Sequence, residues 1–430
     1  MLGIAILIAA LGLALVSLRN LLVPLVGAII SFVAIPEVSV WSMPLPVVGG
    51  VNVGVLVIIL TAATQVVFRL TRYVADVLAA PVIWIALSVW IVGATITNFL
   101  AGIPAPGAWL ELVLAPPLAY LLLQRLVAES PAAPRSLARI IVAVAAAEAL
   151  LALTIWAGAF PQPFADAHAT FSYWWDPEFT RALGTLDHPL ALAGLMLVAT
   201  PLLLTIRRNA LVIGLGALFL ATIAAAESRG ALLLAAVAFV VVLVRRRVSF
   251  VTTLALVGTA AAAVVAVLSV APELVSGLTE KLSDDNGSAN ARVLGLAAGL
   301  PSTLENPVVG GGQGTAFATS QEIGLGTSFE NPTVMTALDW GLAGTVAFTL
   351  AQLLAIRRGF RRGGVGGSAS AGLVLALYLQ TYSSYALPSG TSMLFWLVLG
   401  LTLTPRTGPA SDGHTTTCPR PLRTSTTGAL

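Results

Sequence analysis

Val47–Phe68 reads VVGGVNVGVLVIILTAATQVVF, an apolar stretch without a single charged residue. A helix needs about 20 apolar residues to cross the hydrocarbon core of a bilayer, so this stretch predicts a transmembrane helix. Arg69 and Arg72 follow it directly. Basic residues gather at the cytoplasmic ends of spans, so the stretch also indicates which way this helix crosses.

Similar apolar stretches recur along the chain, separated by charged residues or by breaks rich in Pro and Gly. Together they predict about thirteen spans. The first two spans, near Leu2–Leu18 and Leu21–Ile35, are short and can form a tight helical hairpin. The chain has no basic residue before Arg19, which argues against a cleaved signal peptide. The other spans lie near Leu2–Leu18, Leu21–Ile35, Val77–Thr97, Ala108–Leu126, Ile140–Ala159, Pro189–Ile206, Ala210–Ala226, Ala231–Val244, Phe250–Val270, Pro332–Ile356, Ser368–Tyr385 and Thr391–Thr404.

The composition supports the same fold class. The 430 residues are 57% hydrophobic and only 10% charged, and the mean hydropathy is +0.94. Soluble domains carry about 25% charged residues, so a soluble enzyme, a disordered chain and a nucleic-acid-binding protein are excluded. We expect an all-α polytopic membrane protein with 12–13 transmembrane helices in one domain, residues 1–404, and a disordered cytoplasmic tail, residues 405–430.

The basic residues divide unevenly between the two sides of the membrane. All but four of the 22 fall in alternate loops or in the tail, which places those loops and the C-terminus in the cytoplasm. The N-terminus is then outside if the first span is real. Because Lys281 is the only lysine among many arginines, the chain has the composition of a GC-rich bacterial genome, and we expect the bacterial plasma membrane. The four basic residues on the other side are Arg181, Arg229, Lys281 and Arg292.

The outer face is acidic and carries two long loops, residues 160–188 and 271–331. Loops of this length usually carry function or are disordered, so we expect any chemistry to be extracytoplasmic. Trp174 and Trp175 in the first loop can stack on sugar or belong to an interfacial aromatic belt. With one cysteine and three histidines in the chain, we expect no metal site and no cofactor.

Three of the outer arginines suggest a chemistry. Arg181 precedes a span, Arg229 lies between two closely joined spans, and Arg292 lies in the second long loop. A guanidinium group binds phosphate oxygens in a bidentate way and keeps its charge, so arginines at the membrane surface suit a lipid-linked diphosphate. Taken singly, each is more often a snorkelling residue or the partner of a nearby acid such as Glu227.

Four stretches strengthen the first interpretation when they are taken together. Arg181–Pro189 (RALGTLDHP) is similar to an Arg-x-x-Gly-Thr-x-x-x-Pro pattern that opens a span, and Ser228–Leu233 (SRGALL) to a Ser-Arg-Gly start of a span. Asn306–Gly312 (NPVVGGG), which follows Arg292, resembles a loop ending in Pro, two hydrophobic residues and Gly-x-Gly. Glu330–Gly344 (ENPTVMTALDWGLAG) resembles His-Asn followed by acid-x-Gly-x-x-Gly.

In order, spacing and position relative to the spans, these stretches resemble the O-antigen ligase and O-antigen polymerase (Wzy-type) family of membrane glycosyltransferases. The resemblance extends from about Phe160 to Ile356. One departure is that this chain has Glu330 where the family commonly has a histidine. That histidine is thought to be the base in the ligases, so the departure bears on ligase chemistry more than on membership of the superfamily.

The resemblance implies a donor glycan on a polyprenyl diphosphate and a glycan or glycolipid acceptor in the bilayer. The acceptor hydroxyl attacks the anomeric carbon, and the polyprenyl diphosphate leaves. Arg181, Arg229 and Arg292 would stabilise the negative charge on the leaving diphosphate. Glu330 would take the acceptor proton, and Asn331 beside it would contact substrate. No metal is required.

Several other residues have two interpretations. Asp187 and His188 can contact the acceptor or the sugar, although Asp187 is better placed to cap the span that begins at Pro189. Asp339 is an acid within a span, as is Glu148, and acids within spans are functional candidates; Asp339 can instead hold an arginine or a helix end. Gly310–Gly314 can bind phosphate but is more typical of a flexible loop.

Two other functions remain open from the sequence. The acids Glu148 and Asp339 suit a secondary transporter, but no internal repeat is evident, and long outer loops favour an enzyme. A non-catalytic scaffold for envelope synthesis, in which Arg229 is only structural, is the other alternative.

Overall fold

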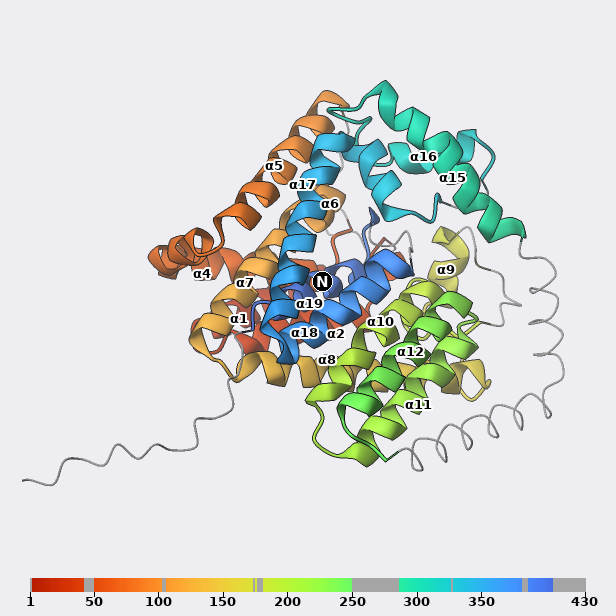
Figure 1. The fold of residues 1–430 in the computed structure, drawn as a ribbon. Coiled ribbons are helices and arrows are strands. Elements are labelled where there is room, and N and C mark those ends of the chain that lie inside the picture. The colour runs from red at the N-terminus through yellow and green to blue at the C-terminus, as the bar shows by residue number, and fades with distance from the viewer. Residues whose placement is uncertain are drawn as a thin grey trace, which may run out of the picture.

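The computed structural model describes residues 2–41, 50–102, 106–172, 175, 181–249, 286–325, 328–380 and 386–404. All regular secondary structure in these ranges is helical, and the helices pack side by side in a bundle (Figure 1). In the part of the chain that the structure describes, five helices are long and apolar enough to cross a membrane, which agrees with the prediction of an all-α polytopic membrane protein. They are α4 (Val53–Leu78), α5 (Pro81–Leu100), α6 (Pro106–Trp109) with the π-helix η1 (Leu110–Leu114) and α7 (Ala115–Glu129), α8 (Ala133–Trp156) and α17 (Pro332–Arg362).

Shorter helices complete the bundle and correspond to the remaining predicted spans. The predicted span at residues 250–270 lies outside the described residues. The first two helices form the predicted hairpin, since they pack on each other across a short turn. The shorter helices are α1 (Leu2–Val16), α2 (Leu22–Ala34), α10 (Pro189–Leu202) with the 3-10 turn η2 (Leu203–Thr205), α11 (Asn209–Ala225), α12 (Arg229–Arg245), α18 (Gly364–Leu373) with the π-helix η3 (Val374–Leu379), and α19 (Gly390–Leu401).

Helix α4 differs in its bounds from the predicted span at residues 47–68. It begins only at Val53, where the side chain of Asn52 accepts a hydrogen bond from Gly54 N–H (2.9 Å) and so caps the helix. It continues beyond Arg69, whose backbone is not helical and bends α4. The Arg69 side chain is held by Leu18 O and by Glu129 (2.9 Å), so the bend lies beside the C-terminal ends of α1 and α7.

One end of the bundle is held together by arginines predicted to face the cytoplasm. Arg139 donates to Thr205 O (3.1 Å), Arg246 to Ile206 O (2.6 Å), and Arg362 to Leu403 O. The last carbonyls of a helix have no partner within the helix, so these guanidinium groups satisfy them. We call this the arginine end, and the other end of the bundle the opposite end.

Among the described residues, the opposite end carries four further helices, three of them short, in the segments between the bundle helices. Two of them, α15 and α16, lie in the segment predicted as the second long outer loop, and they pack against each other and against α17. In the view of Figure 1, α9 lies between this group and the α10–α12 group. The four are α3 (Glu37–Trp41), α9 (Ala165–Phe171), α15 (Asn286–Glu305) and α16 (Thr315–Glu322).

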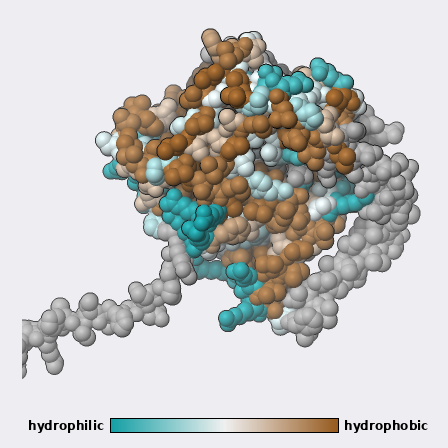
Figure 2. Space-filling view, turned by 45° about the horizontal axis from the view of Figure 1, so that its top comes forward, coloured by the Kyte–Doolittle hydropathy of each residue, from teal (hydrophilic) through white to brown (hydrophobic). Residues whose placement is uncertain are grey.

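The sides of the bundle are apolar, as a lipid-facing surface is. Hydrophobic residues cover much of the face in Figure 2, with hydrophilic residues in separate patches. Exposed aliphatic side chains recur along α5 (Val82, Ile85, Val89) and along α12 (Leu233, Val237, Val240). Such a surface is costly in water and is the one expected against lipid chains.

Candidate functional site

Arg181 lies against the turn between α11 and α12. Its Nε and Nη2 both donate to Ala226 O (3.1 and 2.9 Å), and its guanidinium is 3.8 Å from the Glu227 carboxylate. The backbone follows the same course, because Ala182 N–H donates to Ala225 O (2.8 Å). The alternative that an outer arginine pairs with Glu227 therefore holds for Arg181.

Arg229 is the first residue of α12 and is half-buried. It follows Glu227, which has a left-handed backbone (φ 52°), so the turn between the two helices is tight. The N-terminus of a helix carries a partial positive charge. The fold thus gathers two predicted arginines, separated by a whole helical hairpin in sequence, at one turn with a helix N-terminus.

The Gly184–Thr185 pair is fixed by an acid inside the bundle. Glu148 on α8 accepts from Thr185 N–H (2.6 Å) and from the Thr185 hydroxyl (2.9 Å), which also lies 2.7 Å from Val33 O. Gly184 has a left-handed backbone (φ 67°), and a Cβ there would overlap Glu148 Oε1. Glu148 therefore determines the course of the segment that carries Arg181.

The capping role that the sequence suggested for Asp187 belongs to His188. His188, not Asp187, caps α10, because its Nδ1 accepts from Leu190 N–H (3.1 Å). That bond needs a neutral imidazole, and burial together with the nearby Arg181 charge lowers the pKa of His188 to about 3. The prediction that Asp187 caps this helix was wrong because the Asp187 carboxylate points to another element.

Asp187 accepts instead from Val38 N–H (3.2 Å) at the start of α3. Burial raises the pKa of Asp187 to about 7 against the effect of such backbone bonds. Glu37 and Glu111 lie close by around Asn52, and burial raises the pKa of Glu37 well above its usual value. No sequence pattern indicates this cluster, since its members come from four separate segments.

A second group of predicted residues lies at the start of α17. Glu330 is half-buried and has a left-handed backbone (φ 48°), which is uncommon outside glycine. Asn331 caps α17 by accepting from Thr333 N–H (3.1 Å) and Val334 N–H (3.3 Å). Asp339 is buried and its Oδ1 accepts from Ala316 N–H (2.8 Å) at the start of α16, so it holds a helix end, as its alternative interpretation stated.

Helix α17 is broken at Gly341 (φ 74°, ψ 167°). The glycine-rich stretch, residues 307–314, forms hydrogen bonds with the backbone groups at the break. Gly311 N–H donates to Leu338 O (2.9 Å), Gly312 N–H to Asp339 O (2.9 Å), and Leu342 N–H to Pro307 O (2.7 Å). Two of the family-like stretches are thus paired through their backbones. The expectation of a flexible loop at residues 310–314 was wrong, because the amides of Gly311 and Gly312 donate to carbonyls that would have no helical partner at the break.

Arg292 lies within α15, and its side chain falls outside the described residues, as does Trp174. Trp175 is described and stacks on His168, with ring centroids 5.1 Å apart and an interplanar angle of 23°. Burial lowers the pKa of His168 to about 4, so the imidazole that stacks on the Trp175 indole is neutral.

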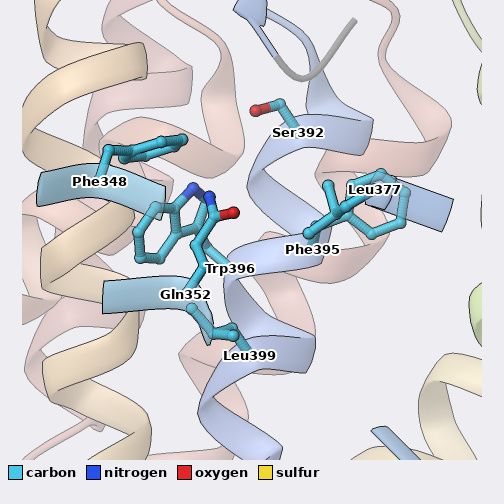
Figure 3. A pocket seen from close by; sticks show the side chains of 7 residues that line it. All are labelled: Phe348, Gln352, Leu377, Ser392, Phe395, Trp396 and Leu399. Carbon is cyan, nitrogen blue, oxygen red and sulfur yellow. The ribbon is translucent and has the colours of Figure 1, made fainter. Parts of the chain in front are cut away.

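A cavity of about 450 Å³ opens beside Arg181. Trp156 and Gln162, which line it, were missed because a tryptophan at a span end is indistinguishable in sequence from an interfacial residue. A second cavity, between α17, η3 and α19, holds only about 20 Å³, room for about one water, among Phe348, Trp396 and their neighbours (Figure 3). The larger cavity is lined by Ile155, Trp156, Gln162, Ala165, Asp166, Ala169, Trp175, Arg181, Ala182 and Leu183.

Comparison with known proteins shows a similarity over part of the chain. A search of curated proteins and a search of solved structures each found no match. A family model described as O-antigen ligase matches residues 214–349. This segment contains the Arg229 turn, the glycine-rich stretch and the start of α17 through its break. Residues 214–349 are therefore similar to the O-antigen ligase family, which agrees with the three sequence motifs that lie in this segment, whereas the Arg181–Pro189 motif lies outside it.

Proposed function

We propose that this protein transfers a glycan from a polyprenyl diphosphate carrier to a hydroxyl group of a glycan or glycolipid acceptor. The family match supports glycan transfer or ligation in general terms. The observation that carries the finer proposal is the meeting of Arg181 and Arg229 at one turn, beside a cavity large enough for part of a substrate. Two guanidinium groups and a helix N-terminus suit a diphosphate.

The chemistry follows from where charge develops. The acceptor oxygen forms a bond to the anomeric carbon as the bond from that carbon to the diphosphate oxygen breaks. The bonding electrons leave with the diphosphate, and preorganised positive charge stabilises them. Arg181 is held in place by Ala226 O and Glu227, so little reordering is needed when the diphosphate binds. We assign Arg292 the same electrostatic role.

We assign the proton of the acceptor hydroxyl to the carboxylate of Glu330. A carboxylate can act as a general base once it lies within hydrogen-bond reach of that hydroxyl. Its left-handed backbone costs about 1–3 kcal/mol, and such strain concentrates at functional sites. Asn331, Asp187, His188 and Asp339 would then support the site by capping the helices around it.

We further propose that the opposite end faces the outside of a bacterial plasma membrane. The arginine end holds the basic residues that the positive-inside rule assigns to the cytoplasm. In this orientation residues 1–404 form one transmembrane domain, and the arginine turn meets carriers presented in the outer leaflet.

Replacing Arg229 tests the proposal. In cells, Arg229→Ala is expected to reduce glycan transfer at least 100-fold and to let the lipid-linked precursor accumulate, because one charge that stabilises the leaving group is lost. The matched control is Arg208→Ala, an exposed arginine at the arginine end. Normal transfer by a correctly inserted Arg229→Ala protein would reject the catalytic role and favour a transporter or a scaffold.

Glu330→Gln tests the base separately. The amide keeps the size of the side chain but cannot accept the proton, so we expect turnover to fall about 100-fold or more while donor binding persists. Glu322→Gln, at the exposed end of α16, is the control. Unchanged turnover in Glu330→Gln would remove Glu330 from the mechanism and leave the arginine assignment standing.

A further inference from the structure

We propose that the cavity beside Arg181 is a sugar subsite, which binds an uncharged pyranose ring of the donor next to the diphosphate. This inference rests on the proposed function and deepens it. The lining of this open cavity of about 450 Å³ combines aromatic, acceptor and cationic side chains. Binding sites for small ligands have volumes of about 300–1,000 Å³.

Two indoles give the cavity its aromatic character. Trp156 is the last residue of α8, and Trp175 stacks on His168, which keeps its ring in place. The face of an aromatic ring is electron-rich and attracts the weakly positive C–H groups on one face of a pyranose. Both indoles are half-buried. These two indoles therefore favour binding of a ring with an apolar C–H face.

Apart from Arg181, the polar side chains in the wall, Gln162 and Asp166, offer acceptor oxygens. Gln162 uses its amide N–H groups on Gly184 O (2.7 Å) and Pro163 O (3.1 Å), which leaves its carbonyl oxygen to accept. Asp166 adds an exposed carboxylate. Acceptors suit sugar hydroxyl groups, which donate. A uronic acid would bring its own negative charge beside Asp166, and like charges repel.

The place of Arg181 links the sugar to the phosphate. Its side chain lines the cavity and at the same time reaches the α11–α12 turn through Ala226 O. A ring in the cavity therefore lies next to the turn where Arg229 begins α12. That is the relation that the first sugar of a lipid-linked glycan has to its diphosphate.

The test compares three short-chain polyprenyl diphosphates: without sugar, with N-acetylglucosamine, and with glucuronic acid. Binding to the purified full-length protein in lipid nanodiscs is measured for each. We expect the N-acetylglucosamine carrier to bind at least 10-fold more tightly than the bare carrier, and the glucuronic acid carrier to gain less. Trp156→Ala should remove most of the gain without changing binding of the bare carrier. Asp166→Asn should improve binding of the glucuronic acid carrier.

The control is Trp109→Ala, a half-buried tryptophan outside the cavity whose Nε1 bonds Thr95 (3.1 Å). Equal affinities for bare and sugar-bearing carriers in the native protein, or an unchanged gain in Trp156→Ala, would overturn the subsite. The proposed function would survive that result if the bare carrier still bound in an Arg229-dependent way. If no carrier bound, quenching of tryptophan fluorescence by methyl N-acetylglucosaminide, lost in Trp156→Ala, would support the subsite alone, and its absence would reject it.

Discussion

At the residue scale, the predicted site depends on side chains that hold backbone in place. Glu148 is the clearest case, because its carboxylate accepts both the N–H and the hydroxyl of Thr185 from within the bundle. The sequence marked Glu148 only as a costly acid in a span. The structure gives it a positioning role for the segment between Arg181 and His188. Its partner Gly184 is small because that carboxylate occupies the space where a Cβ would be.

Replacement of Gly184 by alanine is expected to lower stability and transfer together. The added Cβ would overlap Glu148 Oε1, so Thr185 and Arg181 must shift, and we expect a loss of about 2 kcal/mol or more. Thermal unfolding and transfer are measured in the same preparation. The control is Gly158→Ala, which has a similar backbone (φ 74°) but open space around it, so it carries only the backbone cost, about 1 kcal/mol. Equal losses in the two variants would contradict the overlap.

His188 is expected to make stability depend on pH. Its folded pKa of about 3 is below the unfolded value of about 6.5, so the unfolded chain binds the extra proton. Stability should therefore decrease as the pH falls from 6.5 toward 3. His188→Asn keeps a good helix cap and removes the titration, so its decrease should be smaller in denaturation measured across this range.

Two neighbouring groups titrate in the native protein and in His188→Asn alike, so their contributions to the pH dependence of stability cancel when the two proteins are compared. His168 acts in the same direction, with a pKa of about 4, and Asp187 in the opposite one, with a pKa of about 7. If the free energy of unfolding decreased equally with falling pH in the native protein and in His188→Asn, His188 would not be held neutral.

At the element scale, the main device is the broken helix α17. A helix interrupted inside a bundle leaves peptide groups without partners, which is costly away from water. Here the backbone from Pro307 to Gly312 supplies them, and it is anchored in turn by Thr97, whose hydroxyl donates to Val309 O (2.5 Å), and by Asn98, which accepts from Gln313 N–H (3.1 Å). The break separates the first part of α17, which begins just after Glu330 and Asn331, from the rest of the helix.

The break predicts a sharp difference between two glycines of one helix. Gly341→Ala places a Cβ against Val308 O in a left-handed position, and we expect about 2 kcal/mol or more of destabilisation and loss of transfer. Gly344→Ala, three residues later, meets Trp340 Cβ at an ordinary 3.4 Å in regular helix and should be neutral or slightly stabilising. Unfolding in denaturant compares the two, and similar effects would argue against a required break.

At the scale of the whole molecule, the two ends of the bundle differ in kind. Arginines close the arginine end by covering helix carbonyls, whereas caps and buried acids order the opposite end. The residues singled out from the sequence as catalytic or substrate-binding whose side chains are described lie at the opposite end, on elements that start or finish there. Orientation in the membrane therefore decides which compartment the site faces.

Cysteine labelling tests this orientation. In a Cys418→Ser background, which removes the single native cysteine, a membrane-impermeant maleimide added to intact spheroplasts should label Gly158→Cys at the opposite end. It should not label Ala132→Cys at the arginine end until the membrane is permeabilised. Both positions are exposed, so access is set by the membrane. The reverse pattern would invert the topology and refute an extracytoplasmic site.

How much was predictable varies with the kind of feature. The spans, the hairpin and the start of α10 at Pro189 followed from apolar runs and local breaks, because transfer into lipid depends on composition over a single segment. The bounds of α4 and the cap of α10 could not be predicted from these runs, since Asn52 and His188 act through hydrogen bonds that a hydropathy pattern does not record. Asp187 was misassigned for the same reason: its partner Val38 is distant in sequence.

The sequence by itself determined that the chain is a helical membrane protein, which of its ends is basic, and which motifs resemble a glycan ligase. Each of these depends on the residue types within one segment and on their hydration. Only the tertiary structure decided that Arg181 meets the Arg229 turn, that Glu148 holds Thr185, and that the glycine-rich stretch completes α17. Each of those pairings joins distant segments through two or three hydrogen bonds, whose partners are selected by the packing of the whole bundle.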